Sequence, residues 1–228
     1  MLRRIGMNKI VRVLSAVMAL AMVFGICSCG KRSSKVSVKP GDTVTFGTYE
    51  GRKIEWIVLD TGDNGALLIA KEGLDAKQMD DETGTAENIW EDCDLRAWLN
   101  DEFYKESFTE DEQKKINKTT VGFEKSSANY SFAREGEDTE DYVFLLSYTE
   151  AKKYFRSDES RMCPLSSQAR TNGGYEDYKD NCKWWLRTSA AYKNSYCIVD
   201  DKGMINPDKG ASCHATDVCI RPVMWVNI

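Results

Sequence analysis

Six cysteines have the widest choice of chemistry in this chain, because a thiol can form a disulfide, bind a soft metal or act as a nucleophile. They are Cys93, Cys163, Cys182, Cys197, Cys213 and Cys219. No two of them stand in the C-x-x-C spacing typical of zinc sites, so we predict no metal site. In an exported chain an even number of cysteines favours disulfides over free thiols, but the sequence does not select the pairing.

Tryptophan and arginine side chains near the C-terminus form a second candidate site. In the stretch "NCKWWLRTSA" a strand would place Trp185 and Arg187 on one face and Trp184 on the other. If the closing segment joins the same sheet, Arg221 and Trp225 share the mixed face. Such a face is either a closed structural network or the floor of a ligand site. We therefore name Trp185, Arg187, Arg221 and Trp225 as candidate ligand-binding residues and expect Trp184 in the core.

Other catalytic and metal chemistry has weak candidates. His214 is the single histidine and lies in a polar loop without a nucleophile elbow, which is typical of a surface residue. Asn206-Pro207-Asp208 resembles a calcium-binding lectin loop only loosely and is a common turn sequence. Carboxylate pairs cannot be selected without geometry. We predict no catalytic residue, no metal and no cofactor.

The first 28 residues have the layout of a secretory signal peptide. Basic residues precede an uncharged run of 14 residues from Val13 to Ile26. A helix that spans a bilayer needs roughly 20 apolar residues, so a permanent transmembrane anchor is the weaker interpretation. Met1 and Met7 are both candidates for the start of translation.

The apolar run ends in Ile26-Cys27-Ser28-Cys29, which resembles the lipobox of bacterial lipoproteins. The resemblance implies cleavage after Ser28, diacylglycerol on the thiol of Cys29 and a flexible tether over residues 29–41. We expect the chain to be held by this lipid on the outer face of the bacterial cytoplasmic membrane, since more than one acyl chain gives stable attachment. An ordinary signal peptide with a secreted product is the alternative.

The charge balance restricts the partners. Removing residues 1–28 takes away four basic and no acidic residues, so the net charge changes from −5 to −9. An acidic balance of this size argues against nucleic acid and anionic lipid headgroups as partners. The remaining 200 residues are enough for one domain, which we place at 42–228.

The elements that must position these residues follow from hydrophobic periodicity and turn signals. We predict an N-terminal antiparallel meander, short central helices and short C-terminal strands, that is, one α+β domain. The expected strands are 42–49, 53–60, 65–71, 142–146, 184–188, 195–200, 203–206 and 218–227. The expected helices are 94–103, one beginning at a capping box on Thr109, and one from a capping box on Ser147 to about Phe155. The segments 125–141 and 157–180 are expected to be long surface loops.

Three stretches resemble a known family. "GTYEGRKIEWIVLD", "WEDCDLRAWLNDEFYKESFTEDEQ" and the pair "WWLRTSA" with "VCIRPVMWVNI" are similar to a bacterial domain of unknown function found in surface and secreted proteins. The specific part is its W-W-L-R-[ST] and [VI]-R-P-x-x-W signature. Thr188 stands where serine is usual, and Cys219 with Ile220 stand where glycine and valine are common. The resemblance covers about residues 42–228.

This family is similar in fold to the C-type-lectin-like group, which includes formylglycine-generating enzymes. The resemblance implies a C-type-lectin-like fold but no catalytic residues, and a fold does not determine function. We expect a lipid-anchored surface module that binds a glycan, a peptide or a protein. The alternatives are an extracellular enzyme, a hydrolase or oxidase that uses carboxylates or thiols, and a purely structural surface domain.

The lipobox interpretation predicts that the label from a radioactive fatty acid enters the protein and is lost in the Cys29→Ala variant, because the thiol is the acceptor of the lipid. Gel fluorography of labelled cells measures this. Label that persists in the variant would contradict the lipoprotein assignment, and Cys27→Ala is the matched control that should keep its label.

Overall fold

The structure is a computed structural model that describes residues 37–81, 89–125, 135–175, 177–208 and 210–228. The chain divides into two units, Met1–Ser34 and Lys35–Ile228. The predicted signal peptide 1–28 and Cys29 therefore lie outside the described residues, as does most of the predicted tether. In the described part of the chain, no helix has the length and apolar character needed to cross a membrane.

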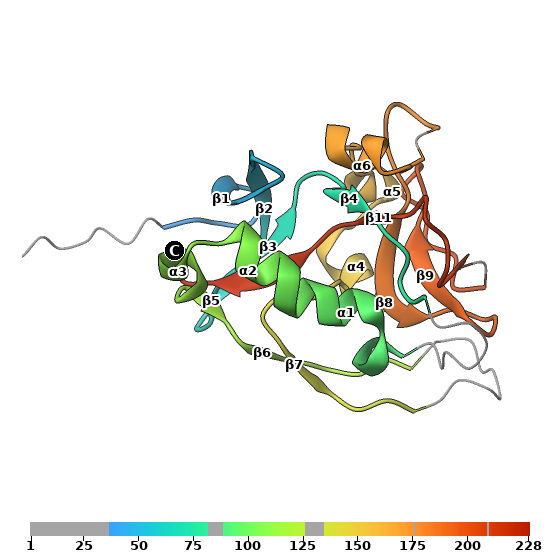
Figure 1. The fold of residues 1–228 in the computed structure, drawn as a ribbon, viewed down its shortest axis with the longest axis horizontal. Helices are drawn as coiled ribbons and strands as arrows, with labels where there is room; N and C mark the ends of the chain where they lie inside the picture. Colours follow the sequence, from blue (N-terminus) through green and yellow to red (C-terminus); the bar gives the residue numbers. More distant parts are fainter. Residues whose placement is uncertain (1–36, 82–88, 126–134, 176, 209) are drawn as a thin grey trace, which may run out of the picture. The chain divides into compact units, whose positions relative to one another are not determined.

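The second unit is a mixed α/β structure with many strands and few, short helices (Figure 1). Its first sheet has the order β1-β2-β3-β12-β5, and all its neighbouring strands are antiparallel. The members are β1 (Thr43–Tyr49), β2 (Arg52–Gly62), β3 (Gly65–Ala70), β12 (Val223–Val226) and β5 (Ile116–Asn117). The predicted N-terminal meander is confirmed as β1-β2-β3, and the C-terminus supplies the next strand.

The second sheet has the order β10-β9-β8-β11-β4. Its members are β10 (Ala211–Ser212), β9 (Ser195–Val199), β8 (Trp184–Ser189), β11 (Cys219–Ile220) and β4 (Asp75–Ala76). The strands β8 and β11 run parallel, and the other pairs are antiparallel. A separate antiparallel pair is formed by β6 (Thr119–Val121) and β7 (Thr139–Asp141).

The helices begin where the sequence places their caps. The segment 94–107 is helical throughout, as α1 (Asp94–Trp98), the π-helical turn η2 (Leu99–Phe103) and α2 (Tyr104–Ser107), after the 3₁₀ turn η1 (Trp90–Asp92). Thr109 and Ser147 form capping boxes with the glutamates three residues on, and start α3 (Glu110–Gln113) and α4 (Tyr148–Tyr154). Both capping predictions are confirmed.

Four parts of the secondary-structure prediction were wrong. The two predicted loops, 125–141 and 157–180, hold regular elements, namely β7 in the first and α5 (Asp158–Arg161) with α6 (Ser167–Thr171) in the second. The segment 142–146 is buried but makes only one isolated bridge, from Phe144 to Val223, and the segment 203–206 makes one at Ile205.

The fourth error concerns the closing strand 218–227, which divides into β11 and β12. Pro222 has no N–H to donate to a ladder, so it interrupts the strand. The chain leaves the second sheet at Arg221 and enters the first sheet at Val223. One short segment thereby links the two sheets.

Arg221 lies at this link and is 1% exposed. Its Nε donates to the carbonyl of Ala70 at 2.9 Å and its Nη1 to the carbonyl of Arg161 at 3.4 Å. The guanidinium carbon lies 4.9 Å from the ring of Trp184 and 5.1 Å from the ring of Phe155. Carbonyl oxygens and aromatic faces thus replace the water around a buried cation.

Three tryptophans of the core satisfy their indole N–H groups with backbone carbonyls, and a fourth, Trp90, donates to the carboxylate of Asp141. Trp56, Trp184 and Trp185 are all fully buried. They donate to the carbonyls of Phe46, Arg161 and Lys77 at 2.7, 3.1 and 2.8 Å. The prediction of Trp184 in the core is confirmed, and Trp185 lies there too.

Arg221→Met would leave the carbonyls of Ala70 and Arg161 without these donors. We expect the free energy of unfolding to fall by about 2–4 kcal/mol, because two buried hydrogen bonds from a charged group are lost and the carbonyl of Arg161 keeps only the indole N–H of Trp184. Urea denaturation followed by tryptophan fluorescence measures the change. Arg156→Met is the matched control on an exposed arginine and should shift stability by about 0.5 kcal/mol at most. Equal stability of the two variants would contradict this role of Arg221.

Candidate functional site

The four candidate ligand-binding residues do not share one face. Trp185 and Arg187 belong to β8 in the second sheet, whereas Trp225 belongs to β12 in the first. Arg221 stacks on Trp184 and not on Trp185. Trp185, Arg187 and Arg221 are 0, 6 and 1% exposed, and only Trp225 is half-buried. The condition that the closing segment joins the sheet of β8 is met by β11 but not by β12, which carries Trp225.

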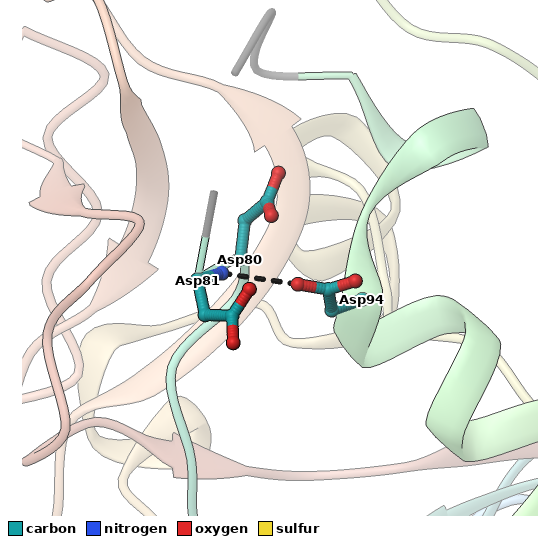
Figure 2. Close-up of side chains that lie close together, drawn as sticks. All are labelled: Asp80, Asp81 and Asp94. Carbon is teal, nitrogen blue, oxygen red and sulfur yellow. Dashed lines mark hydrogen bonds between the residues drawn. The ribbon is translucent and has the colours of Figure 1, made fainter. Parts of the chain in front are cut away.

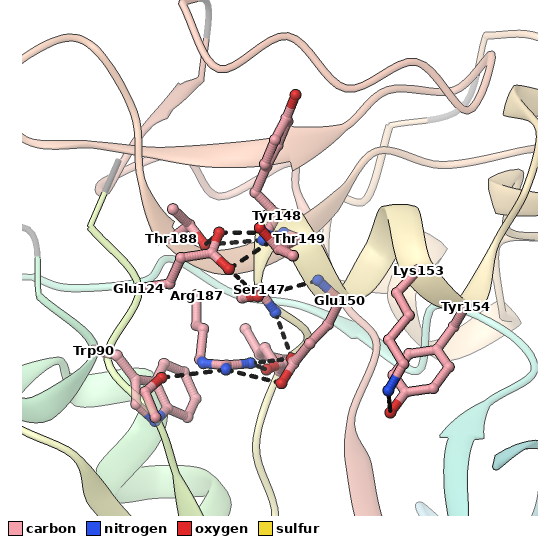
Figure 3. Close-up of polar contacts among 12 residues, drawn as sticks. Trp90, Glu124, Ser147, Tyr148, Thr149, Glu150, Lys153, Tyr154, Arg187 and Thr188 are labelled. Carbon is pink, nitrogen blue, oxygen red and sulfur yellow. Dashed lines mark hydrogen bonds and ion pairs between the residues drawn. The ribbon is translucent and has the colours of Figure 1, made fainter. Parts of the chain in front are cut away.

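Arg187 lies in a polar network, which Figure 3 shows, and its buried Nε has no hydrogen-bond partner among the described residues. Its Nη1 donates to the carbonyl of Leu145 at 2.8 Å, and its Nη2 donates to Gly122 O at 3.3 Å and to Glu150 Oε1 at 3.0 Å. It also forms an ion pair with Glu150. The cavity beside it measures about 10 Å³, which is the space of a single water molecule.

Glu124 extends the same network to β8. Its carboxylate accepts from the hydroxyl of Ser147 at 2.6 Å, from the N–H of Thr149 at 3.1 Å and from the hydroxyl of Thr188 at 3.1 Å. Thr188 keeps the hydroxyl of the serine that is usual at this position and also accepts from the N–H of Tyr148 at 2.9 Å. The ligand-binding role of Trp185, Arg187, Arg221 and Trp225 stays a prediction. Hollows that are open to a ligand lie elsewhere on the domain.

An open hollow of about 310 Å³ lies beside the N-terminal part of the helical segment. It is lined by Lys77, Gln78, Asp94, Leu95 and Trp98. We call it the Trp98 hollow. The helix α1 supplies three of these residues, and the segment after β4 supplies the other two. Trp98 is half-buried, and the Nζ of Lys77 lies 4.6 Å from the centre of its indole ring.

Three carboxyl groups gather next to this hollow, as Figure 2 shows. Asp80, Asp81 and Asp94 each offer an oxygen within 4.8 Å of the others, and the last two are exposed. The N–H of Asp81 donates to Asp94 Oδ2 at 3.1 Å. This hydrogen bond lowers the pKa of the Asp94 carboxyl, and side-chain hydrogen bonds with Asp80 and Asp81 add to the effect. In the described residues these carboxylates are the group whose spacing could hold a cation.

A hydrogen-bonded pair, Tyr49 and Asp75, contacts the residues of the Trp98 hollow. Asp75 is 1% exposed and accepts from the hydroxyl of Tyr49 at 2.6 Å and from the amide of Asn172 at 2.6 Å. Burial, and then this hydrogen bond, raise the pKa of Tyr49. The Nζ of Lys77 lies 3.9 Å from Asp75 Oδ2, and the ring of Tyr49 meets the edge of Trp98 at 6.3 Å.

A smaller hollow of about 100 Å³ has Tyr49 in its lining. We call it the Tyr49 hollow. Its lining carries both signs of charge and is formed by Tyr49, Arg52, Lys53, Ile54, Glu55, Glu72, Leu74, Ser166 and Gln168. The Tyr49–Asp75 pair, of which Asp75 is buried and Tyr49 half-buried, therefore contacts residues of both hollows.

The six cysteines are all free and buried in the structure, so the predicted disulfides are not present in it. Burial raises the pKa of Cys93 and Cys197 to about 12. Such thiols are poor nucleophiles, because the thiolate is the reactive form. Cys93 and Cys197 therefore do not supply the reactive thiol that a thiol-dependent enzyme would need.

His214 is half-buried, and its Nδ1 lies 3.0 Å from the carbonyl oxygen of Asp80.

The Asp80-Asp81 pair was not singled out in the sequence, although its partner Asp94 stands at the predicted start of a helix. A pair of adjacent acidic residues is common on any protein surface. The cluster is therefore recognisable only in the structure, where α1 brings Asp94 next to the pair.

Comparison with known proteins adds one finding. Residues 63–228 match the profile of a domain of unknown function, DUF6273. The chain matches no curated protein and no solved structure. The C-type-lectin-like fold therefore stays a prediction. Because the matched span covers well over half of the chain and includes both tryptophan–arginine motifs, the protein belongs to the DUF6273 family.

Proposed function

We propose that this protein is a lipid-anchored binding module on the outer face of the bacterial cytoplasmic membrane, and that its Trp98 hollow binds the cationic group of a peptide. The ligand group is the ammonium of a lysine or of an N-terminus, or the guanidinium of an arginine. Cys29 would carry the lipid. The observation that supports the ligand class is the half-buried indole of Trp98 next to the exposed carboxylates of Asp81 and Asp94.

The indole is chemically suited to a cation. The face of tryptophan attracts ammonium and guanidinium groups within about 6 Å of the ring centre. The ammonium of Lys77 already occupies this range, at 4.6 Å. The side chain of Lys77 is 36% exposed and its Nζ is 3.9 Å from Asp75, so it can turn toward that carboxylate when a ligand arrives.

The charges around the hollow favour the same ligand class. Asp94 lines the hollow, and the backbone N–H of Asp81 donates to the carboxylate of Asp94. The net charge of −9 without residues 1–28 attracts cations over a longer range. A volume of about 310 Å³ is at the small end of ligand sites, which suits a single side chain or the end of a peptide.

The test is a peptide array probed with the chain that lacks residues 1–28, followed by fluorescence titration of the hits. We expect lysine- and arginine-containing peptides to bind and Asp94→Asn to weaken binding about 10-fold or more, because a hydrogen bond to a charged group contributes about 1.5–3 kcal/mol. Asp111→Asn is the matched control. It removes the same charge from an exposed carboxylate on α3 and should leave the affinity unchanged.

Three results would contradict the proposal. Binding of neutral peptides that Asp94→Asn does not weaken would assign the ligand to another surface. Cleavage of the peptides, seen by mass spectrometry, would favour the enzyme alternative. A purely structural domain would bind nothing on the array.

The pH dependence of binding is a separate prediction. The pKa of Asp94 is lowered, so its charge is present above the ordinary carboxyl range and is lost only as the pH falls through the lower, folded-state value. We expect the affinity for a cationic peptide to hold as the pH falls through the ordinary aspartate range and to decrease below it. Titrations at several pH values and constant ionic strength measure this. Loss of affinity already at mildly acidic pH would show that another group carries the interaction.

A further inference from the structure

Three of the six buried cysteines meet at one place in the core. Cys163 follows α5, Cys182 precedes β8 and Cys219 begins β11. All three are 0% exposed, and Gly73 lies against two of them. We call Cys163, Cys182 and Cys219 the cysteine trio. The other three cysteines of the domain have different neighbours.

Cys163 and Cys182 stand opposite one another on two extended segments. Pro164 and Asn181 form an antiparallel bridge, so the residues one step beyond them face each other as well. The N–H of Cys182 donates to the carbonyl of Cys163 at 2.8 Å. Opposite residues at such positions have Cα atoms about 5.5 Å apart, within the range of roughly 4.4–6.8 Å that a disulfide requires.

Cys182 has Cys219 on its other side. The N–H of Cys219 donates to the carbonyl of Lys183 at 2.8 Å, which places β11 beside the chain just after Cys182. A Cβ on Gly73 would lie 2.7 Å from the Sγ of Cys182 and 3.2 Å from the Sγ of Cys219. The sulfurs of Cys182 and Cys219 therefore both lie next to Gly73.

Glycine at position 73 is what lets the sulfurs approach. Any larger residue would meet Cys182 Sγ at 2.7 Å and Cys219 Cβ at 2.8 Å, closer than a carbon atom tolerates. A side chain there would push β11 and the start of β8 apart.

From this geometry we infer that the cysteine trio is the site of one disulfide, which always includes Cys182 and joins it to either Cys163 or Cys219. The third thiol stays free. In the reaction two thiols lose two protons and two electrons and form one S–S bond. A low-molecular-weight disulfide accepts the electrons and protons and becomes two thiols.

The bond forms while the chain is folding. Burial raises the pKa of Cys163 well above its ordinary value. The hydrogen bond with Cys163 lowers the pKa of Cys182, whereas the hydrogen bond with Cys219 and burial raise it. The raising effects are larger together, so the pKa of Cys182 is also well above its ordinary value. Because exchange needs a thiolate, a trio that is closed while reduced reacts slowly. Thiols that meet before the core closes react freely.

The trio lies directly behind the Tyr49 hollow. Glu72 and Leu74 line that hollow and are the neighbours of Gly73, and the N–H of Ser166 donates to the carbonyl of Gly73 at 3.2 Å. A disulfide at Cys182 fixes the segment that carries these wall residues. The same bond joins β8 to one of the two segments that pack against it.

The experiment is oxidative refolding of the full chain in detergent with oxidised and reduced glutathione, followed by alkylation and peptide mapping by mass spectrometry. In the wild type we expect one disulfide among the trio, with Cys182 in every bonded peptide and the mass of two hydrogen atoms lost. Cys163→Ser should keep the Cys182–Cys219 bond, and Cys219→Ser the Cys163–Cys182 bond. Cys182→Ser should have no bond between the remaining two.

Cys197→Ser is the matched control, since Cys197 is equally buried but lies outside the trio, and this variant should keep the bond. Three results would overturn the inference: a wild type that refolds with all three trio thiols free, a Cys163–Cys219 bond in Cys182→Ser, or a bond that joins Cys182 to a cysteine outside the trio. The wild-type map alone decides the matter if a variant does not fold.

Discussion

The buried guanidinium of Arg221 is the interaction on which the arrangement of the two sheets depends. A cation that is 1% exposed is tolerated only where acceptors and aromatic faces surround it. Ala70 at the end of β3 and Arg161 at the end of α5 supply the carbonyls, and Trp184 of β8 supplies a ring. These groups come from the first sheet, a helix and the second sheet. Satisfying one charge therefore brings three parts of the domain to fixed positions.

Pro222 completes this constraint. It ends β11 next to Arg221, and its carbonyl accepts from the N–H of Ala70 at 2.9 Å before β12 begins. The arginine–proline pair of the family signature is thus explained by packing, since one residue holds the two sheets together and the next redirects the chain between them. The tryptophan–arginine pair of β8 has a comparable role, because Arg187 joins β8 to α4 through Glu150.

The open chemistry lies at the edge of this framework. Of the signature residues, Trp185, Arg187 and Arg221 are buried and donate hydrogen bonds to protein carbonyls, whereas the Trp98 hollow is formed by α1 and by the chain that leaves β4. A rigid core with a charged hollow at its periphery suits a binding module, because the side chains that meet a ligand are held by elements that do not need to move. The Tyr49–Asp75 pair connects this hollow to the Tyr49 hollow, because the hydroxyl of Tyr49 donates to Asp75 and the ring of Tyr49 meets Trp98.

Local features could be predicted from the sequence because their causes lie within a few residues. The meander β1-β2-β3 follows from alternation and turn residues, and the starts of α3 and α4 follow from capping boxes on Thr109 and Ser147. The failures in the strands involve long-range pairing, whereas α5 and α6 were missed although Ser157 and Ser166 cap them locally. The segment 142–146 has the composition of a strand, but it makes only the bridge of Phe144, since β12 already pairs with β3 and β5.

The sequence by itself determined the family, the acidic charge, the capped helices and the presence of Trp184 in the core, because composition, motif and periodicity are properties of contiguous residues. Tertiary structure alone decided that Trp185 and Arg187 are buried, and that Asp94 approaches Asp81. It likewise placed Cys182 beside Cys219. These are contacts between segments far apart in the chain. They depend on where Arg221 and Pro222 pass from one sheet to the other, which no local pattern encodes.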